Sequence, residues 1–166
     1  MIMPSIGATH KERFKLIASV YALFIKDGKI LLLRRFQTGY EDGKYGLVAG
    51  HVDGKETMRN AMAREALEEA GVKIDTEDID LALTMHRSCD DHERIDLFFF
   101  IKKWQGEINN MEPAKCDDLS WFPVNQLPDN TIPYIRYAIE CYLKGSDIAS
   151  LDGIFKKRIP QGCSGR

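Results

Sequence analysis

The stretch from Gly50 to Val72, GHVDGKETMRNAMAREALEEAGV, decides how the rest of the chain is interpreted. It begins at Gly50, contains Gly54, and continues with strong helix formers over about residues 55–70. Gly71 follows at the position where glycine commonly ends a helix in the left-handed conformation. The stretch therefore predicts a glycine-containing loop followed by a helix over about residues 55–70.

The predicted helix gathers its carboxylates on one side. At about 100° per residue, Glu65, Glu68 and Glu69 project from one face, and an apolar arc runs round to the opposite side. That arc consists of Met62, Ala63, Ala66, Leu67 and Ala70. Most acidic helix faces are simply solvated. Three carboxylates on one face can also hold a hard divalent cation such as Mg²⁺, which keeps its remaining positions for water and phosphate.

The spacing of this stretch resembles the Nudix box: Gly, five residues, Glu, seven residues, then Arg-Glu-aliphatic-x-Glu-Glu-x-Gly-aliphatic. The matching residues are Gly50, Glu56, Arg64, Glu65, Glu68, Glu69, Gly71 and Val72. Ala66 departs from the pattern because it is smaller than the usual Leu, Ile or Val, which should affect packing rather than chemistry. On these residues the chain is identified as a member of the Nudix hydrolase family, similar to its MutT-like members.

The resemblance implies an α/β (α+β) fold, a Nudix-type α/β/α sandwich around a mixed sheet. The chain length and its 44% hydrophobic residues fit one domain with a sizeable core. We expect that domain over residues 15–145, preceded by a polar lead over residues 1–14. Residues 146–166 show no clear period and are expected to form a C-terminal tail.

Apolar runs and turn residues predict the remaining elements. Asp27-Gly28 lies between two apolar runs and predicts a hairpin, because its turn needs positive φ at both central residues. A second hairpin is expected from the runs at 81–87 and 94–104. A final helix should carry Pro133 in its first turn. The candidates for its N-terminal cap are Asp129, Asn130 and Thr131.

Composition argues against several functional classes. A net charge of −2 offers no bulk attraction to a nucleic acid polymer or to an anionic membrane. No apolar run approaches the roughly 18–20 residues of a membrane span, and the N-terminus lacks an export signal. The four cysteines show no metal-ligand spacing. Scattered thiols are typical of a reduced protein, so we expect a cytoplasmic location.

The family resemblance implies a metal site within the box. Mg²⁺, with Mn²⁺ as a substitute, would be bound by Glu65, Glu68 and Glu69. The carbonyl of Gly50 would supply a fourth protein oxygen. The cation would neutralise a diphosphate linkage and lower the pKa of a bound water.

The resemblance also implies a general base and residues that orient the acids. A glutamate would take the proton of the attacking water, and the candidates are Glu65, Glu69 and Glu93. Glu93 lies outside the box, in the polar segment before the last apolar run. Arg64 is expected to orient the carboxylates through charge-assisted contacts, and Glu56 to cap the loop or pair with it.

A second group of predicted residues would contact the substrate. MutT-like members often place an arginine at the end of the second strand against the phosphates; Arg35 is the closer match and Arg34 the alternative. Tyr40 and Tyr45 in the following loop could stack on a base, although loop tyrosines more often pack. MutT reads its base with an asparagine near the start of the final helix, and Asn130 lies beside the matching place.

The implied activity is hydrolysis of a nucleoside diphosphate linked to another group. Conversion of a nucleoside triphosphate to a monophosphate and pyrophosphate is favoured, because the E-P-x-K-C segment at 112–116 resembles members with that activity. The proline typical of ADP-ribose hydrolases is also missing downstream of the box. The alternatives are a nucleotide sugar or dinucleoside polyphosphate as substrate, or a non-catalytic nucleotide-sensing module.

The expected partner is therefore a small-molecule nucleotide, and a homodimer is left open. The sequence shows few groups that could read a base beyond Asn130 and the tyrosines. We therefore expect modest discrimination among bases, within the roughly 10–200-fold of an apolar slot, with purine and pyrimidine triphosphates both accepted.

Overall fold

The computed structural model describes residues 15–88 and 92–151, and the predicted N-terminal lead lies outside these ranges. In chain order the elements are β1 (Ile17–Leu23), β2 (Ile25–Lys26), β3 (Lys29–Arg35), β4 (Tyr45–Gly46), β5 (Ala49–His51), α1 (Met58–Ala70), the 3₁₀-helix η1 (Thr76–Asp78), β6 (Ile79–Ser88), β7 (Glu93–Ile101), β8 (Cys116–Pro123), α2 (Pro133–Leu143) and β9 (Ile148–Leu151). No helix within the described ranges is long and apolar enough to span a membrane.

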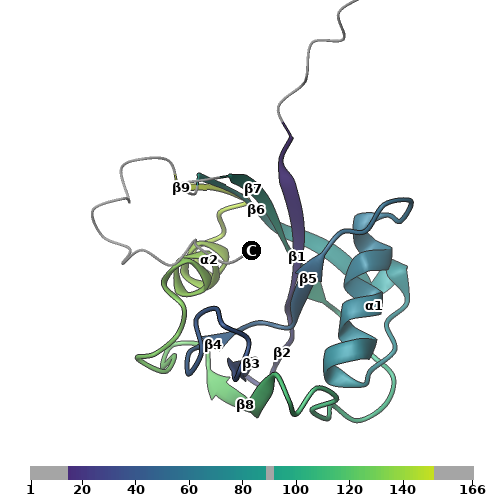
Figure 1. Cartoon of the computed structure of the whole chain (residues 1–166), viewed down its shortest axis with the longest axis vertical. Coiled ribbons are helices and arrows are strands. Elements are labelled where there is room, and N and C mark those ends of the chain that lie inside the picture. Colours follow the sequence, from purple (N-terminus) through teal and green to yellow (C-terminus); the bar gives the residue numbers. More distant parts are fainter. Residues whose placement is uncertain (1–14, 89–91, 152–166) are drawn as a thin grey trace, which may run out of the picture.

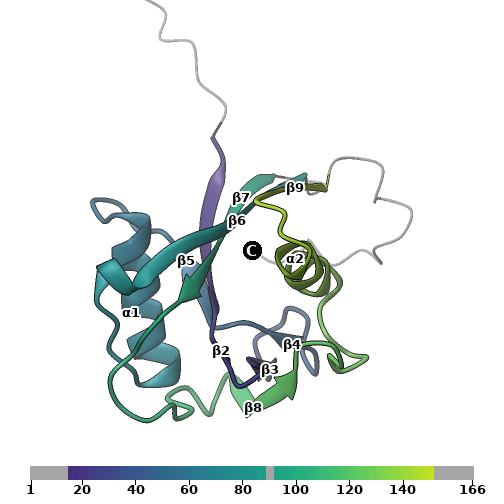
Figure 2. The same ribbon diagram turned by 180° about the vertical axis from the view of Figure 1, so that it is seen from behind.

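A mixed sheet of five strands, in the order β5-β1-β7-β6-β9, lies at the centre of the fold. β1 and β7 pair in parallel, as do β6 and β9, whereas the β1–β5 and β6–β7 pairs are antiparallel. A second sheet contains β2, β3 and β4, with β8 paired to β3. Helices α1 and α2 lie on opposite sides of β1 (Figures 1 and 2). The predicted sandwich of helices around a mixed sheet is confirmed.

Both predicted hairpins are present. Asp27 and Gly28 connect β2 to β3 with φ angles of 51° and 71°, as the turn requires. β6 and β7 pair from Ile79–Ile101 to Ser88–Glu93. The first apolar run, however, is divided: buried Phe24 separates β1, which joins the central sheet, from β2, which joins the second sheet.

The chain after residue 145 contributes to the sheet. β9 pairs in parallel with the stretch Thr84–Arg87 of β6, in the register Thr84↔Ile148 to Arg87↔Leu151. Part of the predicted tail, Ile148–Leu151, therefore forms a strand although the tail has no sequence period, whereas residues 152–166 lie outside the described residues. A four-residue strand is too short for its hydrophobic pattern to stand out from its surroundings.

Helix α1 begins and ends close to the predicted positions. The side chain of its N-cap residue Thr57 accepts a hydrogen bond from the Asn60 amide at 3.2 Å, and Gly71 ends the helix with a φ of 71°. The buried residues of α1 are Ala61, Met62, Ala66 and Ala70. Leu67, expected in the apolar arc, is 46% exposed, so that expectation is wrong. The buried face is rotated toward Glu65 and Glu69, which lie between Ala61 and Ala66 around the helix axis.

Helix α2 carries Pro133 in its first turn as predicted, but none of the three cap candidates caps it. The N-cap residue is Ile132, without a side-chain hydrogen bond. The Thr131 hydroxyl instead donates to the Pro128 carbonyl at 2.7 Å, and Asn130 Nδ2 donates to the Gly43 carbonyl at 2.7 Å. Asn130 thus ties the connection before α2 to the β3–β4 loop, and Thr131 closes the turn within that connection.

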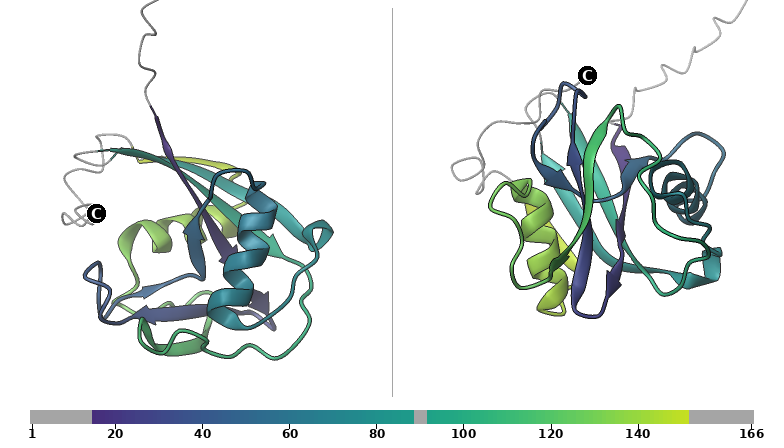
Figure 3. Two further views of the ribbon diagram at one scale, coloured as in Figure 1. Left: turned by 45° about the vertical axis from the view of Figure 1, so that its right-hand side comes forward. Right: turned by 90° about the horizontal axis from the view of Figure 1, so that it is seen from below.

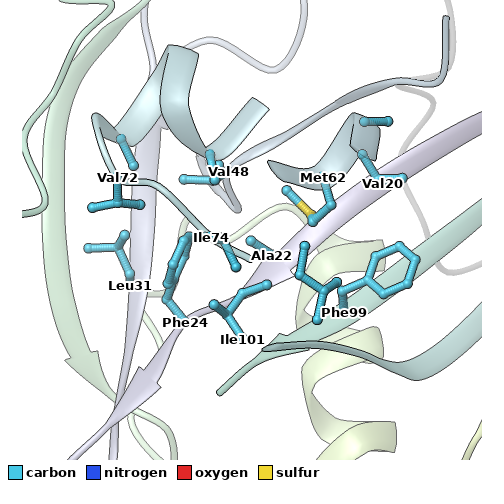
Figure 4. Packing of buried hydrophobic residues seen from close by; sticks show 14 of the residues in the cluster. Val20, Ala22, Phe24, Leu31, Val48, Met62, Val72, Ile74, Phe99 and Ile101 are labelled. Atoms are coloured by element: carbon cyan, nitrogen blue, oxygen red, sulfur yellow. The ribbon is translucent and has the colours of Figure 1, made fainter. Parts of the chain in front are cut away.

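The two faces of the central sheet carry separate hydrophobic cores. On the α1 side, Met62 packs among Val20, Val48 and Phe99, as Figure 4 shows. On the α2 side, a second cluster contains Tyr21, Leu23 and the inner residues of α2. Because β1 supplies alternate residues to both clusters, it is buried on both faces, which explains its continuous apolar run. Figure 3 shows the strands between the two helices.

Candidate active site

Arg64 ties the loop after β5 to helix α1. Its Nη2 donates to Glu56 Oε1 at 2.9 Å and to the His51 carbonyl at 3.1 Å, and its Nη1 donates to Glu65 Oε1 at 2.7 Å. Glu56 also accepts from the Asp53 amide at 2.7 Å. The hydrogen bond between the Arg64 and Glu56 side chains raises the pKa of Arg64 and lowers the pKa of Glu56. The pairing of these two residues expected from the sequence is present.

Two box glutamates turn toward the protein. Glu69 Oε2 accepts from the Ala49 amide of β5 at 2.9 Å, and burial raises the pKa of Glu69 to about 8. The side chain of Glu65 is 12% exposed, and burial raises its pKa against the opposing effect of Arg64. Glu68 differs, because its side chain is 53% exposed and meets Arg64 Nη1 at 3.3 Å.

Gly50 provides the space in which the Glu65 carboxylate lies. A Cβ atom at residue 50 would stand 1.9 Å from Oε1 and 2.0 Å from Cδ of Glu65, far inside van der Waals contact. The φ of Gly50 is not in the left-handed region, so the position requires space, not backbone freedom. The glycine thus brings the backbone of β5 directly against a carboxylate of α1.

The donors at this position suit a hard divalent cation. Mg²⁺ prefers carboxylate and carbonyl oxygens, and a cation would offset the desolvation and mutual repulsion that raise the pKa of Glu69. Within residues 15–88 and 92–151, however, no three His, Cys, Asp or Glu side chains are arranged to hold a metal ion. Arg64 engages Glu65 Oε1 and the Ala49 amide engages Glu69 Oε2, so a cation would meet the second oxygen of each carboxylate, and the exposed Glu68 would have to change rotamer to join them. The predicted ligand set stays a prediction.

An acid outside the box, Glu112, lies beside the box glutamates. It lines a cavity of about 380 Å³ together with Glu69 and Arg35. After burial, the charge of Glu112 is among the causes that raise the pKa of both Glu65 and Glu69. Its own carboxylate accepts from Lys115 Nζ at 2.7 Å. Glu112 belongs to the E-P-x-K-C segment at 112–116, which in the sequence favoured only a class of substrate and did not predict a residue of the site.

Glu93, the acid proposed from the sequence, has a different neighbour. Its Oε2 lies 2.7 Å from Nε2 of His86, on the adjacent strand of the β6–β7 hairpin. Glu93 lines neither the cavity beside Glu69 nor the larger cavity described below. His86 stands in the apolar run of β6, where it is partly buried and hydrogen-bonded.

Of the two adjacent arginines in β3, the structure places only Arg35 at the cavities. Its Nε donates to the Tyr40 carbonyl at 2.7 Å and its Nη2 to Thr38 Oγ1 at 3.0 Å, with the guanidinium 5.3 Å from the centre of the Tyr40 ring. Arg35 lines both cavities, and Tyr40 lines the larger one. Arg34 instead makes two hydrogen bonds to Asp117, at 2.7 and 3.1 Å, and lines neither.

Asn130 and Tyr45 support the framework of the site. Asn130 is bonded through Nδ2 to the Gly43 carbonyl, as described above, and its own carbonyl accepts from the Tyr45 amide at 3.0 Å. The Tyr45 hydroxyl donates to Asp118, and its ring packs edge-on against Phe122 with 4.9 Å between centres. Neither residue lines either cavity. A packed loop tyrosine was the reading favoured for Tyr45.

A larger cavity of about 590 Å³ reaches from β5 to the start of α2. This volume lies within the range of small-molecule sites, about 300–1,000 Å³. Its apolar lining comes from Leu33, Leu47, Ile132 and Ile135. Arg87 and Arg94 also line it, and neither was predicted from the sequence as a site residue.

The two arginines share one fully buried acid, Asp96. Its carboxylate accepts from Arg87 Nε and, at 3.4 Å, from the Tyr21 hydroxyl, while Arg94 Nε lies 3.8 Å away. Arg87 also stands over the ring of Tyr134, with 3.8 Å between the guanidinium carbon and the ring centre. The two arginines lie on adjacent strands, and the register Arg87↔Arg94 brings them together.

Residues 14–140 match the family model of the NUDIX domain. The NAD-capped RNA hydrolase NudC of Chromobacterium violaceum is 28% identical over 130 residues, which cover 78% of this chain and 46% of the relative. The oxidized purine nucleoside triphosphate hydrolase of Danio rerio is 28% identical over 108 residues, 64% of this chain and 65% of the relative. The chain spans about half the length of the NudC relatives it matches.

Solved structures share the fold. The MutT NUDIX hydrolase from Burkholderia pseudomallei has a TM-score of 0.69 at 26% identity, over 76% of this chain and 97% of that chain. The MutT protein from Methanosarcina mazei Go1 has a TM-score of 0.68 at 24% identity, over 80% of this chain and 96% of that chain. The arrangement of a mixed sheet between two helices is thus common to these proteins.

Replacing Gly50 with Ala tests the close approach of β5 to α1. The new methyl group would occupy the place of the Glu65 carboxylate, which would have to rotate away. We expect affinity for Mn²⁺, measured by isothermal titration, to fall at least about 10-fold. The free energy of unfolding should change by less than about 1 kcal/mol, because only the end of a flexible side chain must move.

Gly54→Ala is the matched control, because a Cβ atom there meets nothing within 4 Å. It should change neither metal affinity nor stability. If Gly50→Ala unfolds the protein while the folded fraction binds Mn²⁺ normally, the glycine serves packing and the metal assignment loses its support.

Proposed function

The chain belongs to the NUDIX family, and we propose that it hydrolyses a nucleoside diphosphate linked to another group, with Mg²⁺ as cofactor. The preferred reaction converts a nucleoside triphosphate to a monophosphate and pyrophosphate. The observation that carries this proposal is the position of Arg35, which lines both the cavity with Glu69 and the larger cavity. A diphosphate held at Arg35 would have the box acids on one side and room for a nucleoside on the other.

The acids of α1 would hold the cation. Glu65 and Glu69, with Glu68 after a change of rotamer and the Gly50 carbonyl, supply oxygens on one side of α1 and β5. Bound there, Mg²⁺ would neutralise phosphate charge and acidify a water molecule. Arg64 would keep the Glu65 carboxylate oriented through its hydrogen bond at 2.7 Å.

The general base would be an acid of α1 or an acid of the cavity that Glu69 lines. Glu65 and Glu69 remain candidates, and the contacts of Glu112 favour it over Glu93 as the acid outside the box. Glu112 lines the same cavity as Glu69, whereas Glu93 is hydrogen-bonded to His86. A base must come within hydrogen-bond reach of the water whose proton it takes, directly or through one further water.

A second candidate function is hydrolysis of a dinucleotide. Two relatives are named NAD-capped RNA hydrolases, which favours a nicotinamide dinucleotide over other non-triphosphate substrates. The alternatives of a nucleotide sugar, a dinucleoside polyphosphate or a non-catalytic nucleotide-sensing module are answered by the same experiment.

A panel of nucleotides with Mg²⁺ tests the reaction. We expect the common deoxynucleoside and nucleoside triphosphates to yield pyrophosphate and the monophosphate, without orthophosphate as first product. Turnover should cease in excess EDTA, because the carboxylates alone would repel the phosphates. If NAD⁺, ADP-ribose or a nucleotide sugar exceeds every triphosphate in kcat/KM, the triphosphate proposal fails. Full activity in EDTA would separately overturn the metal requirement.

Glu69→Gln tests the buried carboxylate. Gln keeps an acceptor for the Ala49 amide but removes the charge, so kcat should fall at least about 100-fold, the effect of one lost electrostatic contact. The melting temperature in EDTA should hold or rise, because burial disfavours the ionised carboxylate. Glu140→Gln, which removes an exposed charge from α2, should leave both quantities unchanged. Normal kcat in the Glu69 variant would contradict the assignment.

Arg35→Ala tests the phosphate contact. Loss of a hydrogen bond to a charged group should lower kcat/KM by a factor that corresponds to about 1.5–3 kcal/mol. Arg34→Ala is the control, because the same residue type on the same strand is bonded to Asp117 outside the cavities. Equal losses in the two variants, or a destabilised Arg35 variant with normal kinetics, would show that Arg35 is structural.

A further inference from the structure

We propose that Arg94, at the polar part of the larger cavity, selects nucleosides whose base presents a carbonyl oxygen, as in hypoxanthine, guanine, uracil and thymine. Bases with an amino group at that edge, adenine and cytosine, would be disfavoured. This inference rests on the proposed function and names the substrate class of the same site. It changes the expectation from the sequence, which recognised no base-reading group in the strands.

The charges of the cavity lining favour a ligand rich in hydrogen-bond acceptors. The described lining residues include Arg35, Arg87 and Arg94 but no Asp or Glu. The buried carboxylate of Asp96 lies beside two of these guanidinium groups. A ligand group that meets the guanidinium of Arg94 in this cavity would bind best if it offered lone pairs or negative charge.

The hydrogen bonds of Arg94 leave donor capacity for a ligand. Both of its hydrogen bonds to described residues use Nη2, to Ser19 Oγ at 2.8 Å and to His51 Nε2 at 2.6 Å. Its Nε is buried and has no hydrogen-bond partner among the described residues. The distance of 3.8 Å from this nitrogen to Asp96 Oδ1 is too long for a hydrogen bond. A guanidinium carries five donors, and the two bonds above engage only Nη2. Because Nε is buried, a ligand acceptor would meet this guanidinium at its Nη groups.

The base is the part of a nucleotide that fits this position. Phosphates belong near Arg35 and Glu69, which share the smaller cavity, and Arg94 does not line that cavity. The larger cavity that Arg94 lines also has aliphatic side chains, from β3, the loop after β4 and the start of α2. A flat heterocycle could lie between these apolar groups with its polar edge toward the guanidinium.

Donor and acceptor matching then sets the direction of the preference. A guanidinium can donate to the carbonyl oxygen of a keto base, as arginine does to guanine in nucleic acid recognition. The exocyclic amino group of adenine or cytosine would place donor against donor at the same point. A site that hydrogen-bonds one group discriminates against an analogue that cannot make the bond.

Matched substrate pairs test the proposal. ITP and ATP differ at the purine 6 position, and UTP and CTP at the pyrimidine 4 position, while ribose and phosphates are the same. We expect kcat/KM to be about 10–100-fold higher for ITP than for ATP and for UTP than for CTP, mainly through KM. Arg94→Met should bring both ratios within about two-fold. Arg94→Lys keeps the charge without the planar donor edge and should also lower both ratios. This variant replaces Arg94→Met in the test if the Met variant is unstable.

Arg59→Met, a change at an exposed arginine of α1, is the control and should leave both ratios unchanged.

Binding of the monophosphate pairs IMP/AMP and UMP/CMP, measured by titration calorimetry, tests the same base preference without hydrolysis. Keto preference in binding with no triphosphate turnover would overturn the proposed function alone. Hydrolysis with equal rates within each pair, or a preference that persists in both Arg94 variants, would overturn the role of Arg94 alone. Failure of all four monophosphates to bind, together with no turnover of any triphosphate, would overturn both.

Discussion

The structure depends on the inward orientation of two carboxylates of α1. Taking carboxylates out of water is unfavourable unless hydrogen bonds or opposite charges compensate, and each nearby group does part of this. Arg64 meets Glu65, the Ala49 amide meets Glu69, and Gly50 leaves the space in which the Glu65 carboxylate lies. Because β5 also pairs with β1, the backbone that receives these acids is part of the central sheet. The candidate site is thus built on regular elements, which hold side chains more accurately than loops do.

The sequence allowed the box and the fold to be predicted because their signals are local. The end of α1 follows from Gly71, and the Arg64–Glu56 contact is one that the resemblance to the box implies. The Asp27-Gly28 turn required a specific backbone conformation, and the structure has it. Each of these features involves residues close together in the chain, so composition and spacing carry the information.

What the sequence could not supply depends on which distant segments meet. A helical wheel ranked by hydrophobicity turns the acids of α1 outward, whereas Glu69 points to β5 because the surrounding backbone can compensate it. Which acid outside the box lies near Glu69, Glu93 or Glu112, depends on the paths of the polar segments that contain these two residues. Hydrophobic periodicity does not predict such paths. Arg87 and Arg94 lie at the facing ends of β6 and β7 without any motif around them, and their common place in a cavity follows from strand register.

The parallel pairing of β9 with β6 has a consequence for association between molecules. A strand at the edge of a sheet offers unpaired amide and carbonyl groups to other chains, and long apolar edges promote aggregation. β6 is ten residues long, and β9 covers its stretch from Thr84 to Arg87, while β5 at the opposite edge has only three residues. Over Thr84–Arg87 the edge of the central sheet is therefore the four-residue β9 and not the ten-residue β6, which leaves a shorter edge for pairing with another molecule.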